Sequence, residues 1–157
     1  MTGLRVLALV LVALTAAGEE FSGRVVGVAD GDTITVLVGK EQRKLRLYGI
    51  DCPEKGQAFG TRAKQFTSEL VFGKTVTVEA RGHDRYGRRI CVVRTQEGKV
   101  LNEELLQAGF AWWYKEYAPH EERFAKLESV ARKNRSGLWA DKKPVPPWEF
   151  RARKRQS

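Results

Sequence analysis

The sequence is poor in the residues that build thiolate metal sites or disulfide frameworks. In 157 residues it has two cysteines, Cys52 and Cys91, and two histidines, His83 and His120. These residues do not have the spacing of a zinc site. A single bridge is no disulfide scaffold, and the spacing leaves open whether the cysteines pair. A cysteine nucleophile is disfavoured because neither cysteine lies in a peptidase motif and Cys52 directly precedes Pro53.

Long apolar runs are also scarce. The one continuous run near the N-terminus, residues 6–14, is shorter than the roughly 20 residues that cross a bilayer. Arg5 precedes it and the small residues 15–18 follow it, which is the layout of a secretory signal peptide. We therefore assign residues 1–18 to a signal peptide, with cleavage after Ala17 as an alternative. We expect the mature protein to be secreted or periplasmic, without stable membrane insertion.

Positive charge is abundant. The formal net charge is +9, and residues 141–157 form a proline-rich and then basic C-terminal tail. Such a charge favours an acidic partner, which could be nucleic acid, an anionic membrane or another polyanion, although it also simply aids solubility. We expect the tail to be a flexible segment that attracts phosphates without reading sequence.

The apolar pattern predicts an α+β domain over residues 19–140. Five segments have the pattern of short strands: residues 21–28, 33–38, 44–48, 74–80 and 89–94. Three segments have helical spacing or helix-end signals: a helix that ends at Gly73, one that begins with Asn102 as N-cap, and one that begins at Pro119. Five strands with three helices in this order predict a five-stranded OB-fold β-barrel.

Three carboxylates follow turn or strand-end signals. Asp32 follows the tight turn at residues 30–31, and Asp51 and Glu54 follow the strand predicted at residues 44–48. Carboxylates without a cluster of His or Cys favour Ca²⁺, Mg²⁺ or Mn²⁺ over zinc. Each acid taken alone is explained as well by a role in its turn. Together they predict a cation site.

Two arginines complement these acids. The guanidinium groups of Arg46 and Arg88 are suited to hold a phosphate in a fork. Phosphoryl transfer needs such positive charge, a metal ion and an oriented nucleophile. The alternative for either arginine alone is a surface ion pair.

Six segments in order carry a resemblance to a known family. They are VADGDTITV, KLRLYGIDCPE, GTRAKQFTSELVFGK, DRYGRRICVV, VLNEELLQAGFAWWY and ARKNRSGLW. Together they resemble the staphylococcal nuclease (thermonuclease) family over about residues 21–139. The order and spacing of all six are far more specific than any one of them.

The resemblance implies a Ca²⁺ site. The carboxylates of Asp32 and Asp51 would bind the ion. Cys52 stands where the family has a threonine whose backbone carbonyl is a ligand, and a carbonyl survives the change of side chain. Glu54 matches the acid that contacts the metal-bound water and serves as general base. The loop at residues 55–60 is shorter than in the reference nuclease, which bears on how Glu54 is placed.

The resemblance also implies a substrate site. Arg46 and Arg88 match the arginines that hold the scissile phosphate. Tyr86 matches a tyrosine at the terminal phosphate, and Arg85 stands where a lysine is frequent. A base-stacking tyrosine follows Gly109, and it is either Tyr114 or Tyr117.

These matches predict a secreted, calcium-dependent endonuclease of the micrococcal nuclease type. It would hydrolyse phosphodiester bonds of DNA and RNA, favour single strands, leave 3′-phosphate ends and act as a monomer. The alternative is a non-catalytic OB-fold module that only binds nucleic acid. The presence of Arg46, Glu54 and Arg88 together favours the enzyme.

Overall fold

The structure, a computed structural model, describes residues 18–157. The predicted signal peptide therefore lies, apart from Gly18, outside the described residues. Within residues 18–157 no helix has the length and apolar character needed to cross a membrane.

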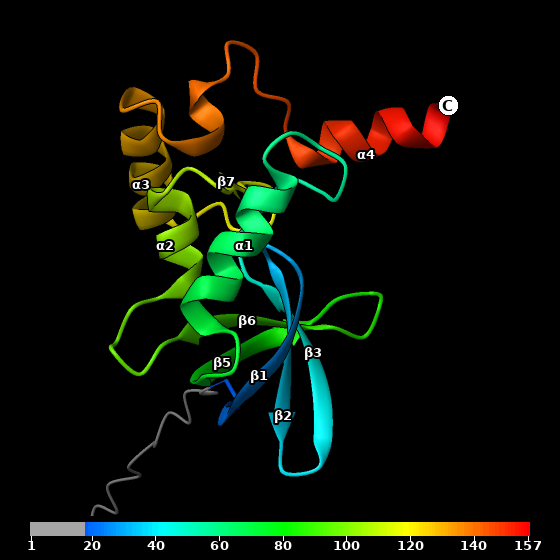
Figure 1. Ribbon diagram of the computed structural model, residues 1–157, viewed down its shortest axis with the longest axis vertical. Helices are drawn as coiled ribbons and strands as arrows, with labels where there is room; N and C mark the ends of the chain where they lie inside the picture. Colours follow the sequence, from blue (N-terminus) through cyan, green and yellow to red (C-terminus); the bar gives the residue numbers. More distant parts are fainter. Residues whose placement is uncertain (1–17) are drawn as a thin grey trace, which may run out of the picture.

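Five strands close into a barrel in the order β1-β2-β3-β6-β5. They are β1 (Glu20–Asp30), β2 (Thr33–Val38), β3 (Glu41–Leu47), β5 (Thr75–His83) and β6 (Arg89–Arg94). Neighbouring strands are antiparallel, except that β3 and β6 run parallel. The predicted α+β class and five-stranded OB-fold barrel are confirmed. Figure 1 shows the barrel in the lower part of the molecule, with the helices gathered at its other end.

A separate pair of short strands lies at that end. β4 (Ile50–Asp51) pairs antiparallel with β7 (Trp112–Trp113), with Asp51 opposite Trp112. Neither two-residue strand has a local pattern long enough to predict it. The pair brings the chain after β3 against the chain after the second helix, and it carries one of the predicted metal ligands.

The three predicted helices are present as α1 (Gly60–Val71), α2 (Leu101–Gln107) and α3 (Glu122–Lys133). α3 begins at Glu122 and not at Pro119. The prediction that Asn102 caps α2 is wrong, because Asn102 is the second residue of that helix and is fully buried. Its side chain donates to the carbonyls of Tyr48 and Cys91 and accepts from the N–H of Val93.

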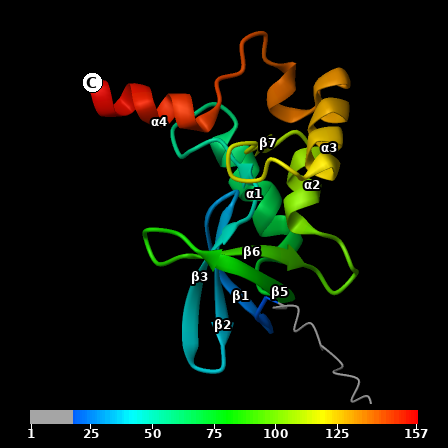
Figure 2. The same ribbon diagram turned by 180° about the vertical axis from the view of Figure 1, so that it is seen from behind.

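The C-terminal tail is not a featureless flexible segment. After the short 3-10 helix η1 (Gly137–Ala140), residues Pro147–Gln156 form a fourth α-helix, α4. Pro147 is its first residue, where the missing N–H costs nothing and the fixed φ suits a helix. Its last turn is basic, which stabilises the carbonyl end of the helix. Figures 1 and 2 both show α4 (red) starting beside the loop that leads into α1.

Two apolar clusters hold these elements. The larger fills the barrel and the space under α1 and α2 with buried side chains such as Val25, Ile34, Leu45 and Leu105. The smaller consists of Trp112, Ala131, Leu138 and Trp139, with Phe59 and Trp148 packed against it. Because Trp148 belongs to α4, this second cluster anchors the start of the C-terminal helix next to β7.

Candidate active site

The turn between β1 and β2 places Asp32. The Thr67 hydroxyl of α1 donates to the carbonyl of Gly31 at 2.5 Å. A Cβ on Gly31 would come within 2.9 Å of Ala63 and 3.0 Å of the Cys52 sulfur, so the close approach of α1 requires glycine. The N–H of Leu47 donates to the backbone carbonyl of Asp32 at 2.9 Å. The turn is therefore fixed from both sides.

The Asp32 carboxylate joins this turn to the segment after β4. Its Oδ2 accepts the backbone N–H of Cys52 at 2.7 Å, and its Oδ1 accepts the Thr33 hydroxyl at 3.1 Å. Asp32 is only 5% exposed. Both donors are neutral, so they orient the carboxylate without neutralising its charge.

Arg46 brings the two buried aspartates together. From β3, its Nη1 donates to the carbonyls of Leu47 and Ile50, both at 2.9 Å. Its Nη2 lies 3.0 Å from Oδ1 of Asp51 and 3.4 Å from Oδ2 of Asp32. One nitrogen thus contacts the carboxylate of Asp32 from the β1–β2 turn and that of Asp51 from β4, and Asp51 is 1% exposed.

Burial makes negative charge on the acids of this cluster costly. It raises the pKa of Asp51 to about 6, against the opposing effects of Arg151 and Arg46. Burial, helped by the charges of Asp32 and Glu54, also raises the pKa of the half-buried Asp30. Burial lowers the pKa of Arg46, but Asp32 and Asp51 outweigh it and raise the pKa overall. A further positive charge at this end of the barrel would be stabilised.

Arg151 of α4 supplies such a charge. Its Nη2 donates to Oδ2 of Asp51 at 2.8 Å, and its Nη1 donates to Oδ1 of Asp51 at 3.2 Å and to Oε1 of Glu54 at 2.8 Å. Burial lowers the pKa of Arg151, but the hydrogen bonds to Asp51 and Glu54 raise it overall. The sequence analysis did not assign Arg151 to the site. The available signal was Pro146-Pro147-Trp148, which starts a helix and gives it an apolar anchor.

The donor set suits a hard cation. Among residues 18–157, no group of three or more His, Cys, Asp or Glu side chains is arranged to hold a metal ion. Asp32 and Asp51 nevertheless offer carboxylate oxygens beside one another, and calcium readily takes its other oxygens from backbone carbonyls and water.

The Cys52 thiol is not part of that set. Burial raises the pKa of the thiol well above its ordinary value, and the sulfur packs against Gly31. A thiol that stays protonated is a poor metal ligand. The backbone carbonyl is the group of Cys52 that could contact a metal ion.

Arg85, Tyr86 and Arg88 form a separate group between β5 and β6. Asp84 accepts the N–H groups of Tyr86 and Arg88, and Nε of Arg88 at 2.6 Å. The guanidinium groups of Arg85 and Arg88 lie 4.9 and 5.5 Å from the centre of the exposed Tyr86 ring. Arg88 therefore pairs with Asp84 and not with the buried aspartates. Figures 1 and 2 show this loop (green) projecting on the same side as α4.

Tyr114 and Tyr117 lie together, with ring centroids 4.6 Å apart and edge to face. The N–H of Tyr114 donates to the carbonyl of Gly49 at 2.9 Å, next to β4. Burial and then the charge of Asp51 raise the pKa of Tyr114. Tyr117, the alternative base-stacking tyrosine, is 64% exposed. Tyr114 is already stacked on Trp148 of α4, with centroids 5.1 Å apart and planes 13° from parallel.

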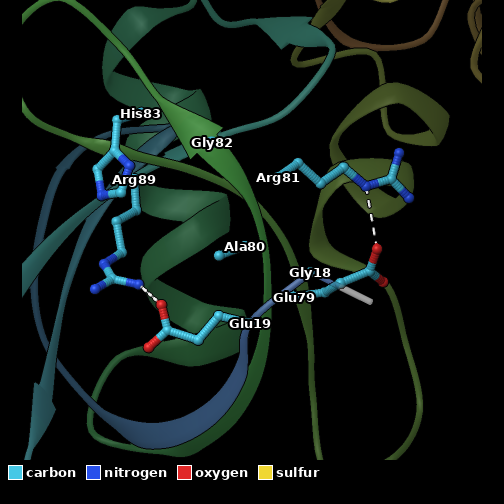
Figure 3. A pocket seen from close by; sticks show the side chains of 8 residues that line it. All are labelled: Gly18, Glu19, Glu79, Ala80, Arg81, Gly82, His83 and Arg89. Atoms are coloured by element: carbon cyan, nitrogen blue, oxygen red, sulfur yellow. Dashed lines mark hydrogen bonds and ion pairs between the residues drawn. The ribbon is translucent and has the colours of Figure 1, made fainter. Parts of the chain in front are cut away.

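A hollow of about 490 Å³ lies elsewhere on the barrel (Figure 3). Its acids are already paired, Glu19 with Arg89 and Glu79 with Arg81. It shares no residue with the aspartate cluster. We therefore place the candidate active site at Asp32, Arg46, Asp51 and Glu54.

The barrel topology and the arginine-bridged pair of buried aspartates define an OB-fold protein with an acidic site at one end of its barrel. The family model described as Staphylococcal nuclease homologue matches residues 44–141. The chain belongs to this family, and the family predicted from the six segments is confirmed.

Relatives extend the similarity beyond those residues. An uncharacterized endonuclease of Escherichia coli O157:H7 is 42% identical over 135 residues, which cover 86% of this chain and 88% of that protein. A micrococcal nuclease of Shigella flexneri is 40% identical over 154 residues, covering 92% and 88%. An uncharacterized endonuclease of Haemophilus influenzae is 40% identical over 147 residues, covering 92% and 82%.

Proposed function

We propose that this protein is a calcium-dependent nuclease that hydrolyses phosphodiester bonds of DNA and RNA and leaves 3′-phosphate ends. Its relatives include proteins named as nucleases and endonucleases. The observation that carries the proposal is the position of Arg46, whose Nη2 contacts both Asp51 and Asp32. This arrangement sets a fixed cation beside two buried acids, as a site for a metal ion and a phosphate requires.

Each residue has a distinct part in the proposed reaction. Asp32, Asp51 and the backbone carbonyl of Cys52 would hold Ca²⁺, which would offset the negative charge that builds up on the phosphate. The remaining N–H group of Arg46, at Nε, together with Arg88, would bind the phosphate oxygens. Glu54 would orient the attacking water and accept its proton at a carboxylate oxygen. The water oxygen would bond to phosphorus as the bond to the 5′-oxygen breaks, and the 5′-oxygen would leave with a proton taken from solvent.

The parts of the substrate away from the scissile phosphate would contact two groups of side chains, Arg85 with Tyr86 and Tyr114 with Tyr117. Arg85 and Tyr86 lie on the loop that also carries Arg88, which suits contacts to a terminal phosphate. Tyr114 or Tyr117 would stack on a base, as aromatic rings do in single-strand binding. A single strand exposes its bases for this purpose, so we propose that single strands are preferred and that a monomer suffices.

We further propose that the protein acts in the periplasm or outside the cell. The basis is the layout of residues 1–18, in which Arg5, an apolar run and small residues follow one another. A protein that acts there meets nucleic acid that has left its own or another cell.

A non-catalytic nucleic-acid-binding module is the second candidate. One observation favours it: Arg151 engages both Asp51 and Glu54, the residues that the reaction needs. Both candidates predict binding, and only the first predicts cleavage.

Digestion separates the two candidates. Single-stranded DNA labelled at its 5′ end is incubated with the purified protein in Ca²⁺ or in excess EGTA. The nuclease shortens the DNA only in Ca²⁺, and the products resist extension by a polymerase until a phosphatase has removed their 3′-phosphates. Binding without shortening in Ca²⁺ would establish the module instead, and shortening in EGTA would exclude the calcium mechanism.

A further inference from the structure

Arg151 takes the carboxylate oxygens that a cation would need. Nη2 of Arg46 already contacts Oδ1 of Asp51, which leaves Oδ2 as the more open oxygen. That oxygen accepts Nη2 of Arg151 at 2.8 Å, while Nη1 of Arg151 shares Oδ1 at 3.2 Å. A cation bound to Oδ2 would lie where the guanidinium lies, and the two positive charges would repel each other. Arg151 and a cation therefore cannot hold Asp51 in this way together.

The same side chain also engages Glu54. Nη1 of Arg151 donates to Oε1 of Glu54 at 2.8 Å, at the place where a base would hold water. Glu54 lies on an exposed loop, and its side chain is 39% exposed, so the acid can be reached once Arg151 leaves. One guanidinium thus occupies a metal ligand and the general base at once.

Trp148 covers an aromatic face one helical turn before Arg151. Its ring lies 5.1 Å from that of Tyr114 and 13° from parallel, which is how a base would lie on the tyrosine. It also meets the edge of Trp112 at 5.6 Å. α4 therefore offers a positive charge to the acids and a flat ring to Tyr114, in place of a metal ion and a base.

The attachment of α4 is light enough to be reversed. Pro147 is the only buried residue of the helix, and the Arg151 side chain is 32% exposed. Ahead of the helix, Gln57 donates to the carbonyl of Val145 at 2.7 Å, which tethers the linker to the loop that carries Glu54. A helix with few buried contacts opens at low free energy, whereas the barrel does not.

We propose that α4 is an intramolecular occupant of the active site, and that Ca²⁺ competes with Arg151 for Asp51. The cation and a nucleic-acid strand displace the helix, and the helix returns when they leave. This inference rests on the proposed nuclease function. It means that cleavage starts only where both calcium and substrate are present, because each must overcome part of the same attachment.

Calcium titration calorimetry on the full chain tests the competition. Arg151→Gln removes the competing charge and leaves a shorter, neutral polar side chain. The matched control is Arg153→Gln, which makes the same change on the same helix at a residue paired only with the exposed Glu149. Arg151→Gln should bind Ca²⁺ on the order of tenfold more tightly, within the usual range of coupling between sites. Arg153→Gln should match wild type.

Two further measurements guard against misreading that result. Trp148→Ala does not alter Arg151 itself but weakens the packing that holds α4 at the site. It should therefore also tighten Ca²⁺ binding. In wild type, adding Ca²⁺ should speed hydrogen exchange in residues 147–156 and leave exchange in β2 and β6 unchanged. Far-UV circular dichroism confirms that each variant keeps its barrel.

The outcomes are distinguishable. If wild type cleaves DNA in Ca²⁺ while Arg151→Gln binds the ion no more tightly, the competition is excluded and the nuclease stands. If Arg151→Gln binds Ca²⁺ more weakly and turns over more slowly, Arg151 is a phosphate-binding residue and α4 is no occupant. If neither wild type nor any variant binds Ca²⁺ or cleaves DNA, the proposed function itself fails and this inference fails with it.

Discussion

The backbone N–H of Cys52 donates to Oδ2 of Asp32 at 2.7 Å. This bond joins the first turn of the barrel to the segment after β4, so that two proposed ligand groups from distant parts of the chain keep a fixed relation. It also shows which part of Cys52 matters. The backbone faces Asp32, whereas the sulfur packs into the core near Gly31 and Ala63.

Neither thiol should react in the folded protein. Both cysteines are free and buried. Burial raises the pKa of Cys91 to about 12 and that of Cys52 well above its ordinary value, so both remain thiols near pH 8. Ellman's reagent should detect no thiol in native protein and both thiols in denaturant. Rapid reaction of the native protein would contradict this burial, and no thiol in denaturant would reveal a disulfide.

Thr67→Val should destabilise the protein and disturb the site. The change keeps the shape of the side chain but leaves the buried carbonyl of Gly31 without the donor that now lies 2.5 Å away. The expected loss in the free energy of unfolding is about 1–3 kcal/mol. Urea denaturation measures it, with Thr61→Val, exposed on the same helix, as the control. Equal stability of the two variants would show that this bond does not fix the turn.

Arg46→Lys should remove most of the activity. Lysine keeps the positive charge, but it cannot contact two carbonyls, Asp51 and a phosphate at once. Turnover should fall on the order of a hundredfold or more, as when a preorganised donor to a developing charge is lost. Arg43→Lys is the matched control, because Arg43 lies on the same strand and pairs with Glu19 and Glu41. Wild-type turnover in a folded Arg46→Lys protein would remove this residue from the chemistry.

Glu54→Gln should slow turnover far more than it weakens substrate binding. The amide has nearly the same shape but cannot take a proton from water, and a general base typically contributes about 10²–10⁴-fold in rate. Single-turnover cleavage and DNA affinity should be measured side by side, with Glu69→Gln on α1 as the control. Losses of equal size in both, or in neither, would mean that Glu54 serves only as the ion-pair partner of Arg151.

The sequence predicted the parts of the fold whose pattern is local. β2 and β6 have the predicted bounds. In β2 polar and apolar residues alternate with the period of a strand, and β6 is a short apolar run between two arginines. The prediction that Asn102 is an N-cap was wrong. It was based on asparagine before an acidic first turn, which is a typical pattern at a helix start. The buried position of Asn102 is set by the carbonyls of Tyr48 and Cys91, which no local pattern reveals.

The candidate site also has residues that the sequence predicted and one that it did not. Asp32, Arg46, Asp51 and Glu54 lie on two motifs. In the structure Arg46 contacts Asp32 and Asp51, and Arg151 links Asp51 to Glu54. Arg151 lies 100 positions from Asp51 along the chain, in a segment whose composition is that of a solvated basic tail. Its role depends on packing of Trp148 against Tyr114 and Trp112, which composition does not encode.

The most direct test asks whether the two buried aspartates hold the ion that the reaction needs. It measures the calcium dependence of cleavage and, by calorimetry, calcium binding, both in wild type and in Asp51→Asn. In wild type, the calcium concentration for half-maximal cleavage of single-stranded DNA should track the measured dissociation constant. Asp51→Asn removes one negative ligand at nearly constant shape, and it should weaken binding and raise the half-maximal concentration together, on the order of tenfold or more. Unchanged calcium binding and unchanged cleavage in a folded Asp51→Asn protein would contradict the assignment of the metal site.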